Sequence, residues 1–163
     1  MATLDVLTYG FALSTDQGSF GYSTNSLLTV GNINILVDTG PSSRRPFLVK
    51  SLKAKGLEPD DIDIVVLTHM HWDHCQNTDL FTNARVLVNP TEIDYARSPN
   101  KWDLAVAAGM ADMMRNMKVD IVSEGDKIVD GISVIETPGH TKGHMSVIAE
   151  VNGEKVLLAG DAM

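Results

Sequence analysis

Strand-like apolar runs dominate the first part of the chain. Two of them, Ser23 to Val30 and Ile33 to Val37, flank the short turn Gly31-Asn32, and this arrangement predicts a β-hairpin. Further along, Ile62 to Leu67 is a nearly continuous run of apolar, mostly β-branched residues, which is typical of a strand covered on both faces. Ala84 to Val88 predicts another short strand.

Helical spacing replaces this pattern in three segments. From Arg44 to Lys55, apolar residues recur at the spacing of one helix face, and the pattern stops at Gly56. Thr91-Glu92, directly after Pro90, predicts the start of a second helix with the threonine as its cap. The run from Asp103 to Met117 is rich in Ala and Met and predicts a third helix.

The last part of the chain returns to strands. Ile128 to Glu136 predicts one strand, and Met145 to Leu158 predicts a pair that turns at Asn152-Gly153. Because strands and helices alternate and several connections are short, we expect a layered α/β fold with mixed sheets beneath helices. No repeat, low-complexity tract or linker interrupts the sequence, so we expect a single domain over residues 1–163.

Ionisable residues follow four of the predicted strands. Asp38, His69, His140 and Asp161 each stand at or just beyond the end of an apolar run. In sheets covered by helices, binding sites gather beyond strand ends, where loops direct side chains to a common point. We therefore expect these four side chains to converge.

The histidines of the chain lie in two short segments, at positions 69, 71 and 74 and at positions 140 and 144. In an extended stretch His69 and His71 point to the same side, so both imidazoles meet one ion. A turn after Trp72 would direct Asp73 and His74 to a second position nearby, which suits a two-metal site. Such a cluster favours metal binding over ordinary buried histidines.

These motifs carry a family resemblance. The segment His69-Met70-His71-Trp72-Asp73-His74 resembles the signature of the metallo-beta-lactamase-fold hydrolases. The resemblance extends over almost the whole chain, because Asp38-Thr39-Gly40, Pro138-Gly139-His140-Thr141 and Gly160-Asp161 follow in the family's order. It implies a four-layer αββα sandwich with the metal site along one edge.

The resemblance also implies roles for the site residues. His69, His71 and His140 would hold the first metal, Asp73 and His74 the second, and Asp161 would bridge both. Zinc, as two ions, is the expected cofactor, although iron and manganese accept the same donors. The implied reaction is attack by a metal-bound hydroxide on a small ester, lactone, thioester or amide, with Asp73 orienting the nucleophile and moving its proton. Asp38 and His144 would support the loops.

Two features depart from the family pattern. Cys75-Gln76-Asn77 replaces the small residue and glycine that usually follow the aspartate-histidine pair, which predicts more bulk beside the site. The sequence ends at Met163, before the further histidine, strands and helix that members normally supply. We therefore expect an exposed apolar face on the last strands, and dimerisation, domain swapping or a longer natural chain to cover it.

Several other residues invite a functional interpretation, but a simpler one is favoured. Met110, Met113, Met114 and Met117 have helical spacing and predict core packing rather than a substrate channel. Trp72 would wall the pocket or simply pack. Arg44 and Arg45 are interpreted as a solvated surface pair and Cys75 as a small packed residue.

Composition and charge disfavour several classes of function. Thirteen Lys and Arg against twenty-one Asp and Glu give a net charge of −8, which disfavours nucleic acid as a partner and a nuclease as the function. Cys75 is the only cysteine, so no internal disulfide forms. Neither a membrane-crossing run nor a leader is evident, so we expect a soluble cytoplasmic protein with a small-molecule substrate and no membrane partner.

Two alternatives to hydrolysis are open. Diiron relatives that reduce oxygen or nitric oxide have more carboxylates in the first motif and depend on a flavin partner, whereas this chain has His71 and His74. The second alternative is a non-enzymatic remnant of the fold that binds one metal or a protein partner.

Overall fold

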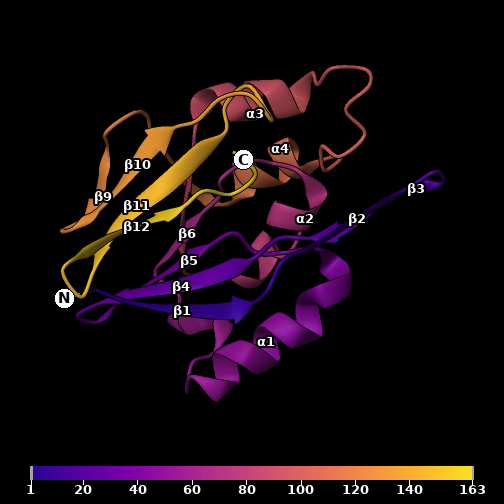
Figure 1. Ribbon diagram of the computed structural model, residues 1–163. Helices are drawn as coiled ribbons and strands as arrows, with labels where there is room; N and C mark the ends of the chain where they lie inside the picture. The colour runs from indigo at the N-terminus through magenta and orange to yellow at the C-terminus, as the bar shows by residue number, and fades with distance from the viewer. Residues whose placement is uncertain (1, 163) are drawn as a thin grey trace.

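A ten-stranded sheet, curled so that its two ends face each other, forms the frame of the computed structural model, which describes residues 2–162 (Figure 1). The strand order is β8-β7-β6-β5-β4-β1-β11-β10-β9, and β12 pairs with β11. We call β1 and β4 to β8 the first half of the sheet, and β9 to β12 the second half. Within the described residues, Ala2 with Val151 is the single β-ladder pair between the two halves.

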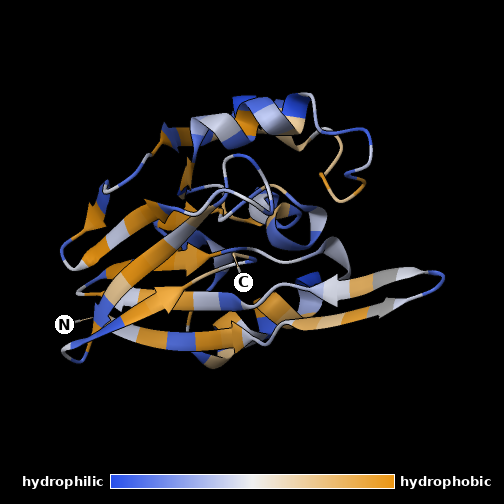
Figure 2. Ribbon diagram, turned by 45° about the horizontal axis from the view of Figure 1, so that its top comes forward, coloured by the Kyte–Doolittle hydropathy of each residue, from blue (hydrophilic) through white to orange (hydrophobic). Residues whose placement is uncertain are grey.

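The strands of the first half are β1 (Ala2–Thr8), β4 (Asn25–Val30), β5 (Ile33–Val37), β6 (Ile64–Val66), β7 (Arg85–Val88) and β8 (Lys118–Ile121). Those of the second half are β9 (Lys127–Val129), β10 (Ile132–Glu136), β11 (Met145–Val151) and β12 (Glu154–Leu158). A separate hairpin of β2 (Phe11–Thr15) and β3 (Gly18–Tyr22) projects from the body (Figure 2).

Both faces of the first half are buried, as the apolar runs predict. In β6, Val65 packs into the cluster beneath the helices, whereas Ile64 and Val66 face the second half. Between the two halves they meet Val134 of β10 and Val147 of β11, both fully buried. Side chains alternate along a strand, so two apolar layers require nearly continuous apolar sequence.

Helices cover only the outer face of the first half. The α-helices are α1 (Arg45–Ala54), α2 (Trp72–Cys75), α3 (Pro90–Arg97) and α4 (Met110–Met113), and the 3₁₀ helices are η1 (Ser42–Arg44), η2 (Pro59–Asp61), η3 (Thr78–Leu80) and η4 (Met114–Asn116). All four α-helices contribute side chains to the cluster on that face. No helix within residues 2–162 is long and apolar enough to cross a membrane.

The outer face of the second half carries apolar side chains. Ile148 of β11 pairs across the ladder with Leu157 of β12, and Leu157 is 50% exposed. Their neighbours in the ladder, Val147 and Leu158, face the interior instead because alternate residues point to opposite faces. This exposure agrees with the expected apolar face on the last strands.

The helix predicted from Asp103 to Met117 is wrong over most of its length. Residues 101–109 form turns, and helical structure begins only at Met110. Gly109 has a φ of +75°, which a helix interior excludes, and Asp103 makes tertiary contacts instead of helical ones. Good helix formers are overridden here by tertiary packing.

Two smaller predictions also need correction. The single strand predicted from Ile128 to Glu136 is a hairpin, because Asp130 and Gly131 turn the chain between β9 and β10 and Gly131 has a φ of +79°. Helix α3 begins at Pro90, and its cap is Asn89, whose side chain accepts a hydrogen bond from the Thr91 N–H. Elsewhere the predicted hairpin of β4 and β5, helix α1 and the turn at Asn152-Gly153 are confirmed.

Candidate metal centre

The four predicted strand ends meet at one edge of the curled sheet. Asp38 follows β5, His69 lies just beyond β6, His140 follows β10 and Asp161 follows β12. The ring centroids of His69 and His140 lie 4.9 Å apart, although the two residues come from opposite halves of the sheet. His71 lies 4.6 Å from each of them. The structure thus brings together side chains that are far apart in the sequence.

Asp38, just after β5, is bonded to the histidine-bearing segment that follows β6. It has a left-handed φ of 58° and is 2% exposed. Its carboxylate accepts hydrogen bonds from the Thr68 N–H (2.8 Å), the Thr68 hydroxyl (2.8 Å) and His74 Nδ1 (2.7 Å). The supporting role expected for Asp38 has this physical basis.

One ring nitrogen of each buried histidine is held by the protein. The Thr68 hydroxyl donates its only proton to Asp38, so it accepts from His69 Nδ1 (3.0 Å). His74 Nδ1 donates to Asp38, and His71 Nε2 donates to Asp103 Oδ2 (3.1 Å). These bonds fix each ring and leave the opposite nitrogen for a ligand.

The opposite nitrogens have no suitable protein partner. His69 Nε2 and His74 Nε2 are buried and make no hydrogen bond within residues 2–162. His71 Nδ1 points at His140 Nε2, 3.0 Å away. Buried ring nitrogens without partners are costly, and a cation among them removes that cost. The donor set therefore fits a metal ion.

The ligand atoms form two groups that share one histidine. In the first ligand group, His69, His71 and His140, all ligand atoms lie within 4.8 Å of one another, and the same holds for the second ligand group, His69, His74 and Asp161. Asp161 lies between the groups, because its carboxylate oxygens are 3.3 Å from His74 Nε2 and 3.4 Å from His140 Nε2.

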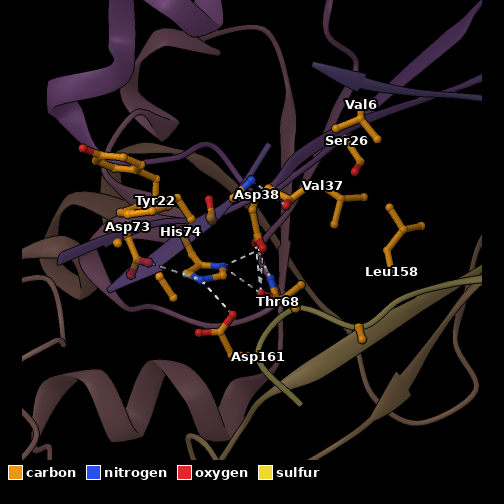
Figure 3. Close-up of a pocket in the computed structure, with 18 of the residues that line it drawn as sticks. Val6, Tyr22, Ser26, Val37, Asp38, Thr68, Asp73, His74, Leu158 and Asp161 are labelled. Atoms are coloured by element: carbon orange, nitrogen blue, oxygen red, sulfur yellow. Dashed lines mark hydrogen bonds and ion pairs between the residues drawn. The ribbon is translucent and has the colours of Figure 1, made fainter. Parts of the chain in front are cut away.

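Asp73 lies at the rim of the second ligand group. Its Oδ2 is 3.7 Å from His74 Nε2, on the side of His74 away from Asp38 (Figure 3). His74 is therefore surrounded by three carboxylates, those of Asp38, Asp73 and Asp161. This arrangement places Asp73 beside the second group rather than within it.

The electrostatics of the site separate two kinds of histidine. Burial, and then the neighbouring imidazoles, lower the pKa of His69 far below its usual range, so this ring is neutral and available as a ligand. Burial also opposes a charge on His74, but the Asp38 carboxylate, the Asp161 carboxylate 3.3 Å from Nε2 and the hydrogen bond to Asp38 outweigh it and raise its pKa to about 10. The carboxylates around His74 favour positive charge, and a metal ion satisfies the same preference.

Two residues that the sequence did not indicate hold His71. Asp103 accepts from His71 and also from the Tyr95 hydroxyl at 2.7 Å. Burial favours the neutral form of Asp103, but the hydrogen bonds from Tyr95 and His71 lower its pKa. Asp103 lies 32 residues from His71 in a segment predicted as helix, so no local pattern could have identified it.

His144 organises the loop that carries Asp161. Its Nε2 accepts a hydrogen bond from the Asp161 N–H (3.1 Å), and its Nδ1 donates to the Thr137 hydroxyl (2.8 Å). Gly160 fits closely against this ring, since a Cβ at position 160 would lie 2.8 Å from His144 Nε2. His144 therefore acts on the site through the backbone of Asp161.

A pocket of about 610 Å³ opens beside the second ligand group. Asp73, His74 and Asp161 line one end, and apolar side chains such as Val6 and Leu158 line the other (Figure 3). The pocket lies between β1 and β4 on one side and β12 on the other. The pocket therefore has ionisable side chains at one end and apolar side chains at the other.

A family model agrees with this geometry. The model of the metallo-beta-lactamase superfamily matches residues 18–163. The chain belongs to the metallo-beta-lactamase superfamily. The curled sheet has the superfamily's fold, as the resemblance implied, but the helix layer over the second half is absent from residues 2–162, and the chain is shorter than its structural neighbours.

Relatives within this superfamily include hydrolases from archaea and bacteria. A probable metallo-hydrolase of Methanocaldococcus jannaschii is 30% identical over 149 residues, which cover 88% of this chain and 69% of the relative. An N-acyl homoserine lactonase of Bacillus thuringiensis is 30% identical over 116 residues, 71% of this chain. The match spans only 44% of the lactonase, so the chain corresponds to less than half of that protein.

Solved structures share the fold at lower identity. A variant of B. thuringiensis AiiA, with N-decanoyl-L-homoserine bound at its active site, superposes with a TM-score of 0.75 at 24% identity, covering 96% of this chain and 73% of AiiA. A probable metal-dependent hydrolase of Staphylococcus aureus gives 0.72 at 20% identity, covering 96% and 71%. Two different proteins thus share the fold of this chain.

In this metallo-beta-lactamase domain, Cys75-Gln76-Asn77 does not crowd the site as predicted. Cys75 is buried in the cluster beneath the helices, and its burial raises the pKa of the thiol. The Gln76 side chain accepts from the Ser42 N–H, and the Asn77 side chain donates to the Thr39 and Pro41 carbonyls. These side chains brace the loop after β5 instead.

The remaining candidates pack as the simpler interpretation predicted. Met110 and Met114 are buried in the helix-covered cluster, and Met113 and Met117 pack against it. Trp72 also packs there. Arg44 is not simply solvated, because its guanidinium stacks on the rings of Tyr22 and Phe47, whereas Arg45 pairs with Asp79.

Proposed function

We propose that this chain is the metal-binding part of a hydrolase that acts on a carbonyl substrate, namely an ester, lactone, thioester or amide. The observation that carries the proposal is the trio His69, His71 and His74, each with one ring nitrogen anchored and the other directed at the ligand groups. Structural zinc sites are closed by four protein ligands, whereas three imidazoles leave a position for water or substrate.

His69, His71 and His140 would hold one metal, and His74 with Asp73 and Asp161 the other. Metals so bound polarise a carbonyl and make water nucleophilic near neutral pH. The intermediate position of Asp161 between His74 and His140 suits a bridging ligand. The donor set suits zinc, and we propose two zinc ions; iron and manganese accept the same ligands.

Asp73 is the residue that we propose for proton transfer. Its carboxylate lines the pocket beside the second ligand group, within reach of a substrate bound there. In that position it orients the attacking water by accepting a hydrogen bond, and it then carries the proton to the leaving oxygen, sulfur or nitrogen. Asp38 is too deeply buried to share this role, because it is 2% exposed and already accepts three hydrogen bonds.

The shape of the pocket supports substrates with an apolar part. The carbonyl would lie near Asp73 and His74, and the apolar part would contact the wall formed by side chains such as Val6, Val37 and Leu158. The lactonase relatives support the same substrate class, because one of them binds N-decanoyl-L-homoserine at its active site.

Metal analysis combined with a substrate panel tests the proposal. Protein purified without added metal is expected to contain zinc and, when loaded, to hydrolyse at least one of a set of aryl esters, lactones and thioesters. The His140→Ala variant serves as the matched control, since it removes a ligand whose side chain is 36% exposed and not part of the core. One tightly bound ion with no turnover across the panel would favour the non-enzymatic remnant.

A further inference from the structure

Glu92 is a buried carboxylate with an unusual pair of partners. It lies in the first turn of α3 and is fully buried. Its Oε1 accepts a hydrogen bond from the Met70 N–H at 2.9 Å, and its Oε2 accepts one from the Gly143 N–H at 3.0 Å. None of the ion pairs formed within residues 2–162 includes it.

The two donors belong to the two loops that carry the first ligand group. Met70 lies between His69 and His71, and Gly143 lies between His140 and His144. These loops come from opposite halves of the sheet, and Glu92 is 22 residues from one donor and 51 from the other. Because the two oxygens of one carboxylate have a fixed separation, this side chain links the two loops at a defined distance, in addition to the backbone hydrogen bond from the Met145 N–H to the Thr68 carbonyl.

The loop around Gly143 lies directly against the backbone of α3. A Cβ at position 143 would lie 2.1 Å from the Glu92 nitrogen, so only glycine permits this approach. Helix α3 is itself anchored, because the Asn89 side chain caps it and also donates to Glu136 at 2.9 Å. The carboxylate therefore projects from a fixed element, and the loops adjust to it.

Stability alone does not account for this arrangement. Burying a carboxylate without a cationic partner is expensive, and apolar side chains of similar volume often stabilise a core as well or better. The two hydrogen bonds lower this cost, but both go to the backbone of ligand-bearing loops. The carboxylate is explained if the spacing of those loops is what it determines.

We infer that Glu92 is a positioning residue that fixes the separation of the two histidine loops and thereby sets the affinity and geometry of the first ligand group. This inference rests on the proposed function only in assuming that His69, His71 and His140 bind a metal. Glu92 does not contact the metal or the substrate; it acts through the backbone of Met70 and Gly143.

The Glu92→Gln variant tests the inference with little change in volume. Glutamine keeps one acceptor oxygen but turns an NH₂ group toward the other backbone N–H. The hydrogen bond that holds one of the two loops is therefore lost. In a Co²⁺ titration of the whole protein, E92Q is expected to bind the ion of the first group about tenfold or more weakly, as for other residues that support metal ligands. Its d–d absorption band is expected to change in position or intensity.

Asp94→Asn is the matched control for the same chemical change on the same helix. The Asp94 side chain is 79% exposed and pairs only with Arg97, so D94N is expected to keep the affinity and the Co²⁺ spectrum of the parent protein. An E92Q protein with lower thermal stability but unchanged affinity and spectrum would overturn the inference. If neither the parent protein nor D94N binds Co²⁺, the proposed function fails instead.

A measurement on the unaltered protein covers the case in which E92Q does not fold. The Met70 and Gly143 amides share one acceptor residue, so local opening should expose them together. Hydrogen exchange is expected to give both amides the same opening free energy, before and after Co²⁺ is added. Clearly different opening free energies for the two amides would show that Glu92 does not hold the two loops as one unit, and would overturn the inference.

Discussion

The two halves of the sheet contribute to the metal centre in different ways. The first half provides His71 and His74, whose side chains are 7% and 3% exposed, together with the fully buried His69. The second half provides His140 and Asp161, whose side chains are 36% and 42% exposed. The first half is covered on both faces, whereas the second half leaves Leu157 half exposed on its outer face.

This difference in exposure indicates that the two halves have different roles in the metal centre. The first half holds preformed ligands with fixed ring orientations, and the second half completes the site when it docks against the first. Deep burial provides precision, because neighbouring side chains determine each rotamer. The partial exposure of His140 and Asp161 leaves the site open to solvent on that side, which is where a substrate would enter. Four predictions test this comparison.

The largest effect is expected from removing the buried ligand that both groups share. His69→Ala should lose the ion of the first group, weaken the other because His69 also borders the second group, and lower the rate of hydrolysis by more than about a hundredfold, beyond the range for residues that only support ligands. Elemental analysis and initial rates measure the two effects, and circular dichroism verifies the fold. Retention of both ions would show that His69 is not central to the first half's contribution.

Removing a ligand of the second half should have a more selective effect. Asp161→Asn is expected to release the ion of the second group and keep that of the first, because the first group retains its three histidines. Activity should fall along with the lost ion. Titration with a chelator, followed by metal analysis, measures how tightly each ion is bound. Equal loss of both ions would contradict the different roles of the two halves.

A support residue of the first half should matter less than a ligand. Asp103→Asn is expected to weaken the first ion by about ten- to a hundredfold, because it disturbs the partner that orients His71. Asp112→Asn is the control, since that side chain is 71% exposed and pairs with Arg115. Metal dissociation constants decide the outcome, and equal values for D103N and D112N would exclude a role for Asp103.

The smallest effect is expected from crowding the Asp161 loop. Gly160→Ala adds a Cβ 2.8 Å from His144 Nε2 at a φ of +56°, with a backbone cost of about 1–2 kcal/mol. Gly153→Ala has a similar φ of +83° but meets no atom within 4 Å. Urea unfolding should show a loss of about this size for G153A and a larger one for G160A, and only G160A should weaken the second ion. Equal metal binding by the two variants would show that this loop tolerates displacement.

Local sequence predicted the parts of the site that lie on regular elements. His69 and His71 follow a buried strand and alternate along an extended segment, so their convergence could be predicted from side-chain direction alone. The turn at Asn152-Gly153 was equally clear, since both residues adopt the positive φ that this pair favours. These features depend only on neighbours in the chain.

The support residues could not be predicted in the same way. Glu92 and Asp103 reach the ligand loops over 22 residues or more, and neither stands in a pattern that indicates a site. Composition was misleading for Asp103, because an Ala- and Met-rich segment favours helix until Gly109 and the contact with Tyr95 fix another path. Their roles depend on tertiary packing.

The single pairing of Ala2 with Val151 also has a kinetic consequence. Contacts such as Ala2 with Val151 and Val66 with Val134 join residues distant in the chain, so closing the sheet carries a loop-closure cost that local hairpins avoid. Docking of the halves is therefore a late step in folding, and neither ligand group is complete before it. A metal ion bound between the two halves would therefore not guide early folding, but it would lower the rate at which the halves separate.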